Sequence, residues 1–296
     1  MKVTVVILNF NDSDTTKKCA RSVERAIRHL DSSHAATIIL VDNGSQPRLA
    51  QEAPELLRIK DLSIVESPHN LGFAGGMNSG LRLVYETDSD AVWLLNNDVV
   101  VEPQSLAALC NFKKANSGKL CIGAVIIDQS TGKVQTIGGY RYNTLLGFAR
   151  PFGKSLDAAN LPRIQPKIDY VDGSALFIDV NILREIGGIP AQNFLFYEEL
   201  NLTQALGGKH NLAVCLEAIV KHKGGASTEK LVAGSKTYHS TLAALRYTRH
   251  HLKLAVPIVF LLRLTVALYR DCGMRGGGHA RNAILAGREF LFDPQA

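Results

Sequence analysis

Several polar clusters in this sequence could do chemistry, and the first is Asn96-Asn97-Asp98, which directly follows the apolar run VWLL. A carboxylate and amide oxygens are hard ligands that suit Mg²⁺ or Mn²⁺, which commonly take one or two carboxylates plus phosphate oxygens and water. A cation held there would neutralise the charge that develops on a departing nucleoside diphosphate. Taken alone, the triplet has little specificity, because a turn that ends a strand uses the same residue types.

Two further groups lie far downstream. Glu198-Glu199 stands at a predicted helix start, where the helix dipole favours negative charge, and a carboxylate there could act as a general base toward a substrate hydroxyl. His222, in VKHKGGAS, could bind a metal through a ring nitrogen. Each has a simpler interpretation, since acidic residues are common in the first turn of a helix and a solitary histidine is more often structural.

Asp42 follows the apolar run TIILV, at a position where a carboxylate could accept hydrogen bonds from a nucleotide base or ribose. Asp-Asn-Gly is also strong turn chemistry, and for this residue alone the sequence favours the turn. Neither Gly-x-Gly-x-x-Gly nor a P-loop follows the first strand, so neither a Rossmann dinucleotide site nor a P-loop site is indicated.

The elements that must position these groups alternate between strand and helix. Strands are predicted at 3–8, 37–41, 62–66 and from 92 onward, and helices at 13–30, around 77–84 and from Pro103. This order predicts a mostly parallel α/β sheet with helices on both faces. Each strand ends in Asn, Asp or Gly, and ligands bind beyond the carboxyl ends of the strands in such sheets. Four polar strand ends at one edge are a stronger signal than any one of them.

The regular alternation of strand and helix ends after residue 115. We expect irregular strands and loops to 170, a strand at 174–180, a helix at 181–188, a helix from Glu198, two short strands in LAVCLEAIVKHKGG and helices over 236–270. The chain should therefore form a large α/β domain over 1–235 and a basic helical extension over 236–296.

Composition narrows the class of protein. Hydrophobic residues make up 46% of the 296 residues, so a sizeable core can form. The five cysteines are odd in number and no two have metal-ligand spacing. The N-terminus also lacks an apolar stretch with a small-residue cleavage site. These features favour a reducing, cytoplasmic setting.

The net charge of +6, with a pI near 9.0, is concentrated near the C-terminus. Residues 246–281 contain seven lysines and arginines against Asp271 alone. No aromatic-interleaved basic stretch or nucleic-acid motif accompanies them, so we expect no nucleic-acid partner. The apolar segment 252–269 is interrupted by charge too often to span a membrane. An interfacial amphipathic helix and a packed core helix both fit it, and the sequence leaves the two open.

The sequence resembles the family 2 glycosyltransferases, and more narrowly their bacterial rhamnosyltransferase-like branch, in seven motifs taken in chain order. These motifs are VTVVILNFN, ILVDNGS, NLGFAGGMNSG, WLLNNDVVVEP, YVDGSALFIDVNILREIGG, FLFYEELNL and VKHKGGAS. The resemblance implies a GT-A fold and transfer of a sugar from a nucleotide-diphosphate sugar, with inversion at the anomeric carbon. It also implies a nucleotide-sugar half over 1–115 and an acceptor and catalytic half over 116–235.

The resemblance implies roles for the polar groups by their positions in these motifs. Asp98 becomes the principal carboxylate for a divalent cation (Mg²⁺ or Mn²⁺), and His222 completes the metal site. Glu199 falls on the family's catalytic aspartate, next to Glu198. The nucleotide-sugar site takes Asn9, Asn11, Asp42, Asn43, Asn70, Gly72, Phe73, Ala74, Asn96 and Asn97, and the acceptor side takes Asp172, Gly173 and Ser174.

Three departures from the family's pattern stand out. Asn96 replaces a usual aspartate, which removes a negative charge and should weaken metal affinity. Glu199 is one methylene longer than aspartate. The helix after it has Ala205 near a position where arginine is usual, and Gly207 and Gly208 weaken it as a helix.

The resemblance also implies partners. The donor would be a deoxythymidine-diphosphate (dTDP) or uridine-diphosphate (UDP) sugar, and the acceptor a glycan or a polyprenyl-diphosphate-linked glycan. The basic extension could then contact the inner face of the membrane peripherally. A non-catalytic sugar-nucleotide-binding subunit of a glycan assembly complex is the alternative, motivated by Asn96 and the weakened helix. A nucleotidyltransferase fits less well, because its glycine-rich N-terminal loop followed by Arg and Lys is absent.

Overall fold

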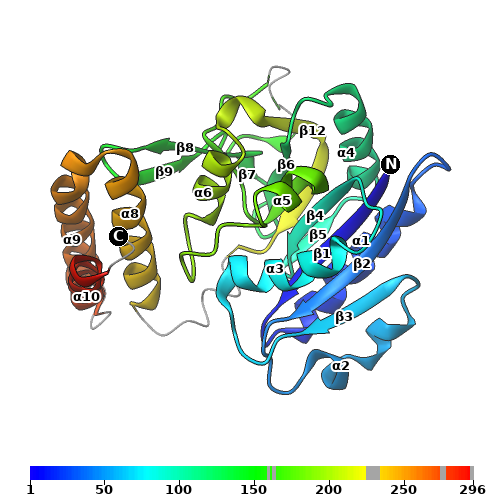
Figure 1. Cartoon of the computed structure of the whole chain (residues 1–296), viewed down its shortest axis with the longest axis horizontal. Coiled ribbons are helices and arrows are strands. Elements are labelled where there is room, and N and C mark those ends of the chain that lie inside the picture. Colours follow the sequence, from blue (N-terminus) through cyan, green and yellow to red (C-terminus); the bar gives the residue numbers. More distant parts are fainter. Residues whose placement is uncertain (159–160, 162–164, 225–233, 274–277, 294–296) are drawn as a thin grey trace.

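The computed structural model describes residues 1–158, 161, 165–224, 234–273 and 278–293 (Figure 1). The main sheet contains β1 (Lys2–Asn9), β2 (Ala35–Asp42), β3 (Leu62–Glu66), β4 (Ala91–Asn96), β5 (Val99–Val101), β6 (Cys121–Asp128), β7 (Val134–Ile137), β11 (Ala175–Asp179) and β12 (Leu212–His222). Their order across the sheet is β3-β2-β1-β4-β11-β6-β12-β5, and β7 pairs with β6.

Parallel pairing dominates this sheet, as predicted. β1 pairs in parallel with β2 and β4, β2 with β3, and β6 with β12, whereas β11 runs antiparallel to β4 and β6. The fourth predicted strand divides in two. β4 ends at Asn96, and the apolar residues beyond form β5, which pairs antiparallel with β12. Asn97 and Asp98 are therefore the link between two strands that pair with different partners.

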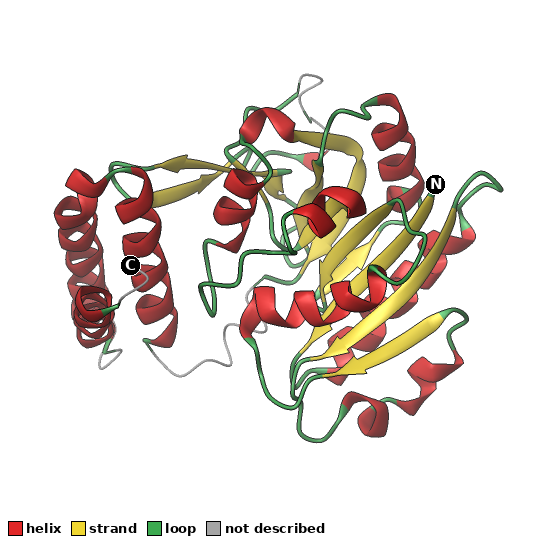
Figure 2. Ribbon diagram, viewed as in Figure 1, coloured by secondary structure: helices red, strands yellow, loops and turns green. Residues whose placement is uncertain are grey.

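Helices cover both faces of the sheet (Figure 2). The helices of the sheet domain are α1 (Ser13–Arg28), α2 (Leu49–Glu52), α3 (Gly72–Val84), α4 (Ser105–Ala115), α5 (Val180–Glu185) and α6 (Glu198–Ala205), with 3₁₀ turns at Pro54–Arg58 and Lys209–Asn211. Alternate side chains of β1 serve the two faces, because successive residues of a strand point to opposite sides. Val5 and Ile7 join the core formed with α1 and α4, and Val6 joins the core formed with α3 and α5.

Several element bounds differ from the predictions: the helix expected at 181–188 is Val180–Glu185, and a helix at His279–Phe292 lies beyond those expected over 236–270. The helix expected from Pro103 begins at Ser105, because the chain first makes a turn in which the Ser105 amide donates to the Glu102 carbonyl at 3.0 Å. The two short strands expected in LAVCLEAIVKHKGG are one strand, β12. A bulge between Cys215 and Ile219 absorbs the irregular part and lets the strand keep pairing with β6 on both sides.

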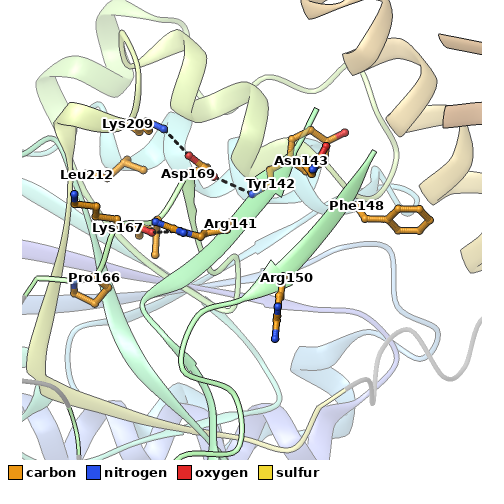
Figure 3. A pocket seen from close by; sticks show the side chains of 11 residues that line it. Arg141, Tyr142, Asn143, Phe148, Arg150, Pro166, Lys167, Asp169, Lys209 and Leu212 are labelled. Carbon is orange, nitrogen blue, oxygen red and sulfur yellow. Dashed lines mark hydrogen bonds and ion pairs between the residues drawn. The ribbon is translucent and has the colours of Figure 1, made fainter. Parts of the chain in front are cut away.

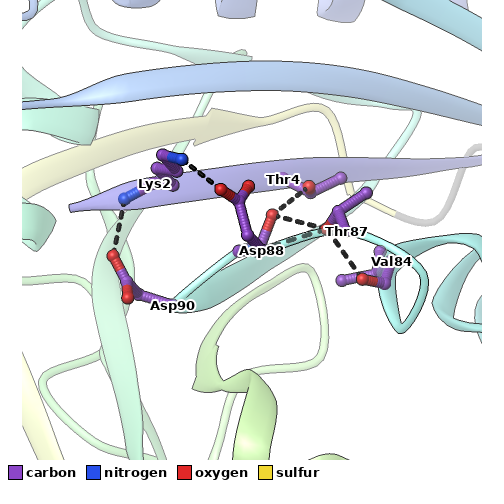
Figure 4. A network of polar contacts seen from close by, with 7 residues as sticks. Lys2, Thr4, Val84, Thr87, Asp88 and Asp90 are labelled. Carbon is purple, nitrogen blue, oxygen red and sulfur yellow. Dashed lines mark hydrogen bonds and ion pairs between the residues drawn. The ribbon is translucent and has the colours of Figure 1, made fainter.

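Polar contacts fix the start of β1 against the segment that leads into β4 (Figure 4). The Lys2 amide donates to Asp90 Oδ2 at 2.7 Å, and the Lys2 ammonium pairs with the Asp88 carboxylate. Thr4 Oγ1 and Ser89 Oγ share a hydrogen bond of 2.8 Å. An exposed ion pair adds little stability. The main effect of this network is therefore to align β1 with the segment before β4. With the register fixed here, the opposite ends of β1 and β4 also lie side by side.

A three-stranded ribbon and a helical unit complete the fold. The ribbon has the order β10-β8-β9, with β8 (Gly139–Asn143), β9 (Phe148–Pro151) and β10 (Tyr170–Val171). The C-terminal extension consists of α8 (Ser235–His251), a 3₁₀ turn at Lys253–Ala255, α9 (Val256–Gly273) and α10 (His279–Phe292). These helices share a small core that includes Leu245, Val259 and Phe290, and they lie beyond the ribbon at the far end from β3 (Figure 1). None of the helices in the described ranges is both long and apolar enough to cross a membrane.

Candidate active site

The polar strand ends meet at one edge of the sheet, as the sequence predicted. The register places Asn9 opposite Asp42 and Leu8 opposite Asn96, so β1, β2 and β4 end together. The sequence therefore located the edge of the sheet correctly. What each side chain does at that edge depends on the loops that follow.

Asp42 and Asn9 point into the protein. Asp42 is fully buried, and its two carboxylate oxygens accept from the amides of Ser45 at 3.1 Å and Leu49 at 2.8 Å. Asn9 Nδ2 donates to Ser45 Oγ at 3.0 Å, and Asn11 donates its amide to the same hydroxyl at 2.9 Å. In this structure Asp42 is the turn-forming residue that its Asp-Asn-Gly context favours, and its contact with a nucleotide stays a prediction.

Asn43 holds the loop that begins at Asn70. Its Nδ2 donates to Asn70 Oδ1 and to the Gly72 carbonyl, both at 3.0 Å, and its Oδ1 accepts from the Leu71 amide. Gly72 has a φ of +74°, and a Cβ there would stand 2.2 Å from the Phe194 carbonyl oxygen. Glycine is therefore required at position 72 by both backbone conformation and space.

The loop from Asn70 leads into α3 and toward a cavity. The Phe73 amide donates to the Phe194 carbonyl at 3.1 Å, which ties this loop to the segment ahead of Glu198-Glu199. Phe73 lines the cavity described below, whereas Ala74 is fully buried and does not line it. The predicted donor-side loop and the predicted catalytic segment are thus joined by a backbone hydrogen bond.

The three residues Asn96-Asn97-Asp98 point in different directions. Asn96 is partly exposed and lines the cavity, and its amide donates to the Ser174 carbonyl at 3.1 Å. Asn97 is buried, and its Nδ2 donates to Thr16 Oγ1 at 3.0 Å, so it joins β4 to α1. Of the three residues, only Asp98 points toward the predicted metal corner. Asp98 is buried, with 6% of its surface exposed.

Strand pairing brings Asp98 to His222. Val99 of β5 lies opposite His222 of β12, so the residue before Val99 is next to the histidine ring. Asp98 Oδ1 is 3.2 Å from His222 Nε2, and His222 Nδ1 is 3.1 Å from Gln135 Oε1. Burial lowers the pKa of His222, but the hydrogen bond and charge of Asp98 outweigh it and leave that pKa above its ordinary value.

The Asp98–His222 corner fits a divalent cation in its donor chemistry. Asp98 Oδ1 is buried and lies 3.2 Å from His222 Nε2, and an ionised carboxylate oxygen keeps a further lone pair that it can give to a cation. Gln135 Oε1 can only accept, so a neutral His222 ring keeps its proton on Nδ1 and presents Nε2, on the Asp98 side, as a ligand. Within the described residues, no three His, Cys, Asp or Glu side chains form a metal cluster. A cation here would need diphosphate oxygens and water as its other ligands, which is usual for Mg²⁺.

Glu199 lies in a cavity of about 400 Å³ beside this corner. The residues around it include the predicted acceptor-side loop, both glutamates and several aromatic side chains: Asn96, Gln135, Tyr140, Tyr170, Asp172, Gly173, Ser174, Phe196, Tyr197, Glu198, Glu199, His222 and Arg263. The Asp98–His222 pair therefore borders the same cavity through His222. Size and lining are those of a small-molecule site.

Two residues in an unusual backbone conformation lead into the glutamates. Phe196 and Tyr197 have φ values of 75° and 70°, in the left-handed region that residues with large side chains rarely adopt. The helix α6 then begins at Glu198, as predicted. Strained backbone of this kind persists where the surroundings hold it, and it concentrates at functional sites.

Burial sets the protonation of the glutamates. It is the main cause that raises the pKa of Glu199 to about 7, and the charge of Asp172 raises it further. Burial and the neighbouring Glu199 also raise the pKa of Glu198, whose Oε1 has no hydrogen-bond partner among the described residues. A carboxylate with a pKa near neutrality is suited to proton transfer, because it is ionised in part and still basic.

The acceptor-side loop is built around its own aspartate. Asp172 Oδ1 accepts from the Ser174 amide at 2.9 Å and from the Ser174 hydroxyl at 2.6 Å, whereas Asp172 Oδ2 is buried without a partner among the described residues. This turn presents the backbone of Gly173 to the Glu199 carboxylate. The sequence grouped these residues correctly as one loop at the cavity.

Sequence reasoning missed two contributions to the cavity. Tyr140 and Tyr170 stack with ring centroids 5.1 Å apart, at the ribbon side of the cavity. Arg263 of α9 donates from Nη2 to the Tyr197 hydroxyl at 2.7 Å and to the Gly147 carbonyl at 2.6 Å. The alternation in GYRYN signalled the strand that carries Tyr140. A lone arginine inside the apolar segment 254–269 could have pointed to an inward contact at Arg263.

The fold is that of the GT-A glycosyltransferases. The solved structure of Staphylococcus aureus TarS 1-349 has the same fold, with a TM-score of 0.60 at 12% identity over 98% of this chain and 80% of that one. Its complex with UDP-GlcNAc gives a TM-score of 0.58 at 12% identity, over 98% and 81%. The chain belongs to glycosyl transferase family 2, whose family model matches residues 4–171.

Curated relatives agree with this family. The chain is 22% identical, over 81% of its length and 83% of theirs, to the N-acetylglucosaminyl-diphospho-decaprenol L-rhamnosyltransferase of Mycobacterium tuberculosis. It is 20% identical, over 67% of its length and 59% of that protein, to the low-salt glycan biosynthesis hexosyltransferase Agl10 of Haloferax volcanii. The predictions of a GT-A fold and of a glycosyltransferase are confirmed.

Proposed function

We propose that this glycosyltransferase moves a sugar, with rhamnose the first candidate, from a nucleotide-diphosphate sugar to a glycan or lipid-linked glycan acceptor in the synthesis of a cell-surface polysaccharide. One observation supports the proposal most. Glu199, with a pKa raised to about 7, and His222, 3.2 Å from Asp98, line the same cavity. A base and a diphosphate-holding corner are the two parts that a direct displacement needs.

The proposed mechanism is a single displacement with inversion. The Glu199 carboxylate takes the proton of the acceptor hydroxyl, and the acceptor oxygen forms a bond to the anomeric carbon from the face opposite the nucleotide. The bond from that carbon to the diphosphate oxygen breaks, and the nucleoside diphosphate leaves with the electron pair. Asp98 and His222 would hold a divalent cation, whose chemistry is to neutralise charge on the diphosphate. No covalent sugar–enzyme intermediate is required.

Neighbouring residues have supporting roles in this proposal. Asn9, Asn11 and Asn43 stand at the strand ends where the nucleotide would lie, with the loop from Asn70 to Ala74 beside its sugar. The names of the similar proteins support the donor class, since one relative is an L-rhamnosyltransferase and a similar structure was solved with UDP-GlcNAc. We therefore propose a dTDP- or UDP-sugar as donor. The same rhamnosyltransferase acts on a polyprenyl-diphosphate-linked sugar, which supports the acceptor class.

The alternative is a non-catalytic sugar-nucleotide-binding subunit, and Asn96 in place of aspartate favours it. A screen separates the two. Donor hydrolysis and transfer are measured with dTDP-rhamnose and UDP-sugars in Mn²⁺, alongside thermal shifts by the same compounds. Turnover that disappears in Glu199→Gln, while the nucleotide still shifts the melting temperature, supports the enzyme. Nucleotide binding without turnover on any acceptor would leave the binding subunit as the better assignment.

We also propose peripheral contact with the inner face of the membrane through α9. The solvent side of α9 and of the 3₁₀ turn before it carries Leu254, Ile258, Leu261, Leu268 and Tyr269, and Leu254 and Tyr269 are 90% and 81% exposed. No charge occurs within 254–269 except Arg263, which points the other way into the cavity. Exposed Lys253 and Arg270 stand at the two ends of this face. An apolar helix face with cationic ends suits the interface of an anionic bilayer.

A matched pair of variants tests this contact. Leu261 and Leu57 are 60% and 56% exposed, on α9 and on the remote 3₁₀ turn after α2. Leu261→Gln should lower binding to anionic vesicles by about tenfold, because one inserted leucine is worth roughly 1.5–3 kcal/mol. Leu57→Gln should leave it unchanged. Equal binding by both variants would exclude α9 as the contact.

A further inference from the structure

A second cavity lies outside the proposed active site. It has a volume of about 610 Å³ and lies between the β8–β9 hairpin and the segment 166–169. Four cationic side chains line it, from the hairpin, that segment and the turn before β12: Arg141, Arg150, Lys167 and Lys209. Figure 3 shows Arg141 directed toward Lys167, and Lys209 toward Asp169. A cavity of this size can hold more than a single phosphate.

The negative charge in this cavity is already engaged. Asp169 Oδ1 pairs with Lys209 Nζ at 2.9 Å, and Asp169 Oδ2 accepts from the Tyr142 amide at 2.9 Å. Arg141 Nε donates to the Lys167 carbonyl at 3.1 Å, which brings the two cations together without neutralising either. No carboxylate among the described residues forms an ion pair with Arg141, Arg150 or Lys167. The four cations and the one carboxylate that line the cavity therefore give it a net charge of +3.

Two of these cations, Arg141 and Arg150, lie where their charges repel each other. Arg141 of β8 lies directly opposite Arg150 of β9 in the antiparallel register, so the two side chains emerge on the same face of the hairpin. Like charges directly opposite each other destabilise a strand pair. An anion bound between them would turn this repulsion into two charge-assisted contacts, since arginine presents a planar fork that matches phosphate oxygens.

The hairpin separates this cavity from the active site. Successive residues of a strand face opposite sides, so Tyr140 and Ala149 line the proposed active site while Arg141 and Arg150 line the basic cavity. The two cavities are therefore back to back across one layer of backbone. A ligand in the basic cavity would lie next to the cavity of Glu199 without occupying it.

We propose that the basic cavity binds a diphosphate group, as a site separate from the one that holds the donor. Its Arg141–Arg150 pair contacts the phosphate oxygens, and Lys167 adds a third cation. A diphosphate fits better than a monophosphate, because it carries enough charge and length to meet cations from both the hairpin and the segment 166–169. The group could be free in solution or carried by a polyprenyl lipid, and these two sources are separated experimentally.

The first experiment titrates inorganic pyrophosphate into the full chain by calorimetry in EDTA, so that no cation assists binding at the Asp98–His222 corner. Arg141→Gln/Arg150→Gln should weaken binding by at least about tenfold, since it removes two charge-assisted contacts to the phosphate oxygens. Lys133→Gln/Lys154→Gln is the matched control, with the same loss of charge at two exposed lysines outside the cavity. His222→Ala should also leave this binding intact, which makes the result independent of the proposed reaction.

The second experiment identifies the source of the diphosphate. Vesicles of phosphatidylcholine with and without a polyprenyl diphosphate are floated with the wild type and with the arginine variant. Recruitment by the lipid that is lost in the variant assigns a lipid-linked ligand, and pyrophosphate binding without recruitment assigns a soluble one. No pyrophosphate binding by the wild type, or equal loss in the lysine control, would overturn the proposal.

A stability measurement guards against misfolding. Without ligand, Arg141→Gln/Arg150→Gln should melt no lower than the wild type, because it removes a repulsive pair. If it melts lower, Lys167→Gln decides, since its ammonium makes no ion pair with a described carboxylate. That variant should weaken pyrophosphate binding several-fold at an unchanged melting temperature, and unchanged binding would count against the site.

Discussion

The Glu199 carboxylate lies directly against the backbone of Gly173. A Cβ atom built at position 173 would stand 1.9 Å from Glu199 Oε1, a distance that no real contact reaches. The turn that holds Gly173 is fixed by Asp172, whose Oδ1 accepts from both the amide and the hydroxyl of Ser174. The acceptor-side loop therefore sets where the proposed base can be, and only glycine leaves room for it.

Gly173→Ala should displace the Glu199 carboxylate and lower kcat by on the order of 100-fold, because a shift of about 1 Å in a reacting group has that effect. Binding of the nucleoside diphosphate should persist, since the Asp98–His222 corner is untouched. Gly118→Ala is the control, because a Cβ there meets no atom within 4 Å. Steady-state kinetics and nucleotide calorimetry provide the readouts. Unchanged kcat in Gly173→Ala would remove Glu199 from the reaction.

The pH dependence of the reaction should follow Glu199. A general base works only when ionised, and the pKa of this carboxyl is raised to about 7, mainly by burial and then by the charge of Asp172. The value of kcat/KM should therefore fall as pH decreases below about 7. Asp172→Asn removes the repulsive charge and should move this fall to lower pH. A profile that is flat between about pH 5 and pH 8 would contradict the assignment.

Much of this arrangement could be predicted from sequence because it follows from apolar runs and chain order. β-branched runs located β1, β2 and β4, and parallel pairing then brought Asn9, Asp42 and Asn96 to one edge. Asp98, Glu199 and His222 were named through the resemblance of whole motifs to a family. The contact between Asp98 and His222 follows from the pairing of β5 with β12, which no single motif contains.

The rest depended on loop paths and long-range packing, which local patterns do not encode. Asp42 turns inward because the amides of Ser45 and Leu49 come to its carboxylate, and that requires the fold of the following loop. Asn97 joins α1 through Thr16 for the same reason. Gln135 reaches His222 from another strand, β7. Such residues have no periodic signal, so only the structure identifies them.

The hydrogen bond between His222 Nδ1 and Gln135 should control the metal affinity of the Asp98–His222 corner. Gln135 Oε1 is 3.1 Å from His222 Nδ1 and so keeps the proton of the neutral ring on Nδ1, with Nε2 on the Asp98 side. Gln135→Leu should weaken Mn²⁺ binding in the presence of UDP by about 10- to 100-fold, which is the usual effect of losing such a partner. Mn²⁺ titration followed by electron paramagnetic resonance measures this. Gln51→Leu, on exposed α2, is the control. Equal affinity in both variants would show that the histidine holds no metal.

Glu199 should cost the protein stability at neutral and higher pH. Its folded pKa is raised above the ordinary value of 4.5, so the native state binds more protons than the unfolded state between those two values. The free energy of unfolding then falls as pH rises from about 4.5 to about 7, and the loss remains above pH 7. Glu199→Gln should therefore melt higher than the wild type at pH 8 and lose that advantage at pH 4.5. Glu185→Gln, exposed on α5, should show no such trend.

The C-terminal extension should act on the site through Arg263. Its guanidinium donates to the Tyr197 hydroxyl at 2.7 Å and to the Gly147 carbonyl at 2.6 Å, and it lies 5.8 Å from the centre of the Tyr197 ring. Tyr197 has a φ of 70° immediately before Glu198, so these contacts help to hold a strained backbone. We treat Arg263 as a positioning residue, because it acts on Glu199 through the segment that precedes it.

Arg263→Ala should lower the free energy of unfolding by about 1.5–3 kcal/mol, the usual effect of losing hydrogen bonds to a charged group. It should also lower kcat by about tenfold and change KM for the donor little, because the metal corner is formed by other elements. The fall of kcat/KM with pH should shift as well, since the burial of Glu199 would change, and a purely structural role would leave that profile in place. Arg270→Ala, exposed on the same helix, is the control. Equal kcat and pH profiles in the two variants would mean that α9 packs beside the cavity without positioning its base.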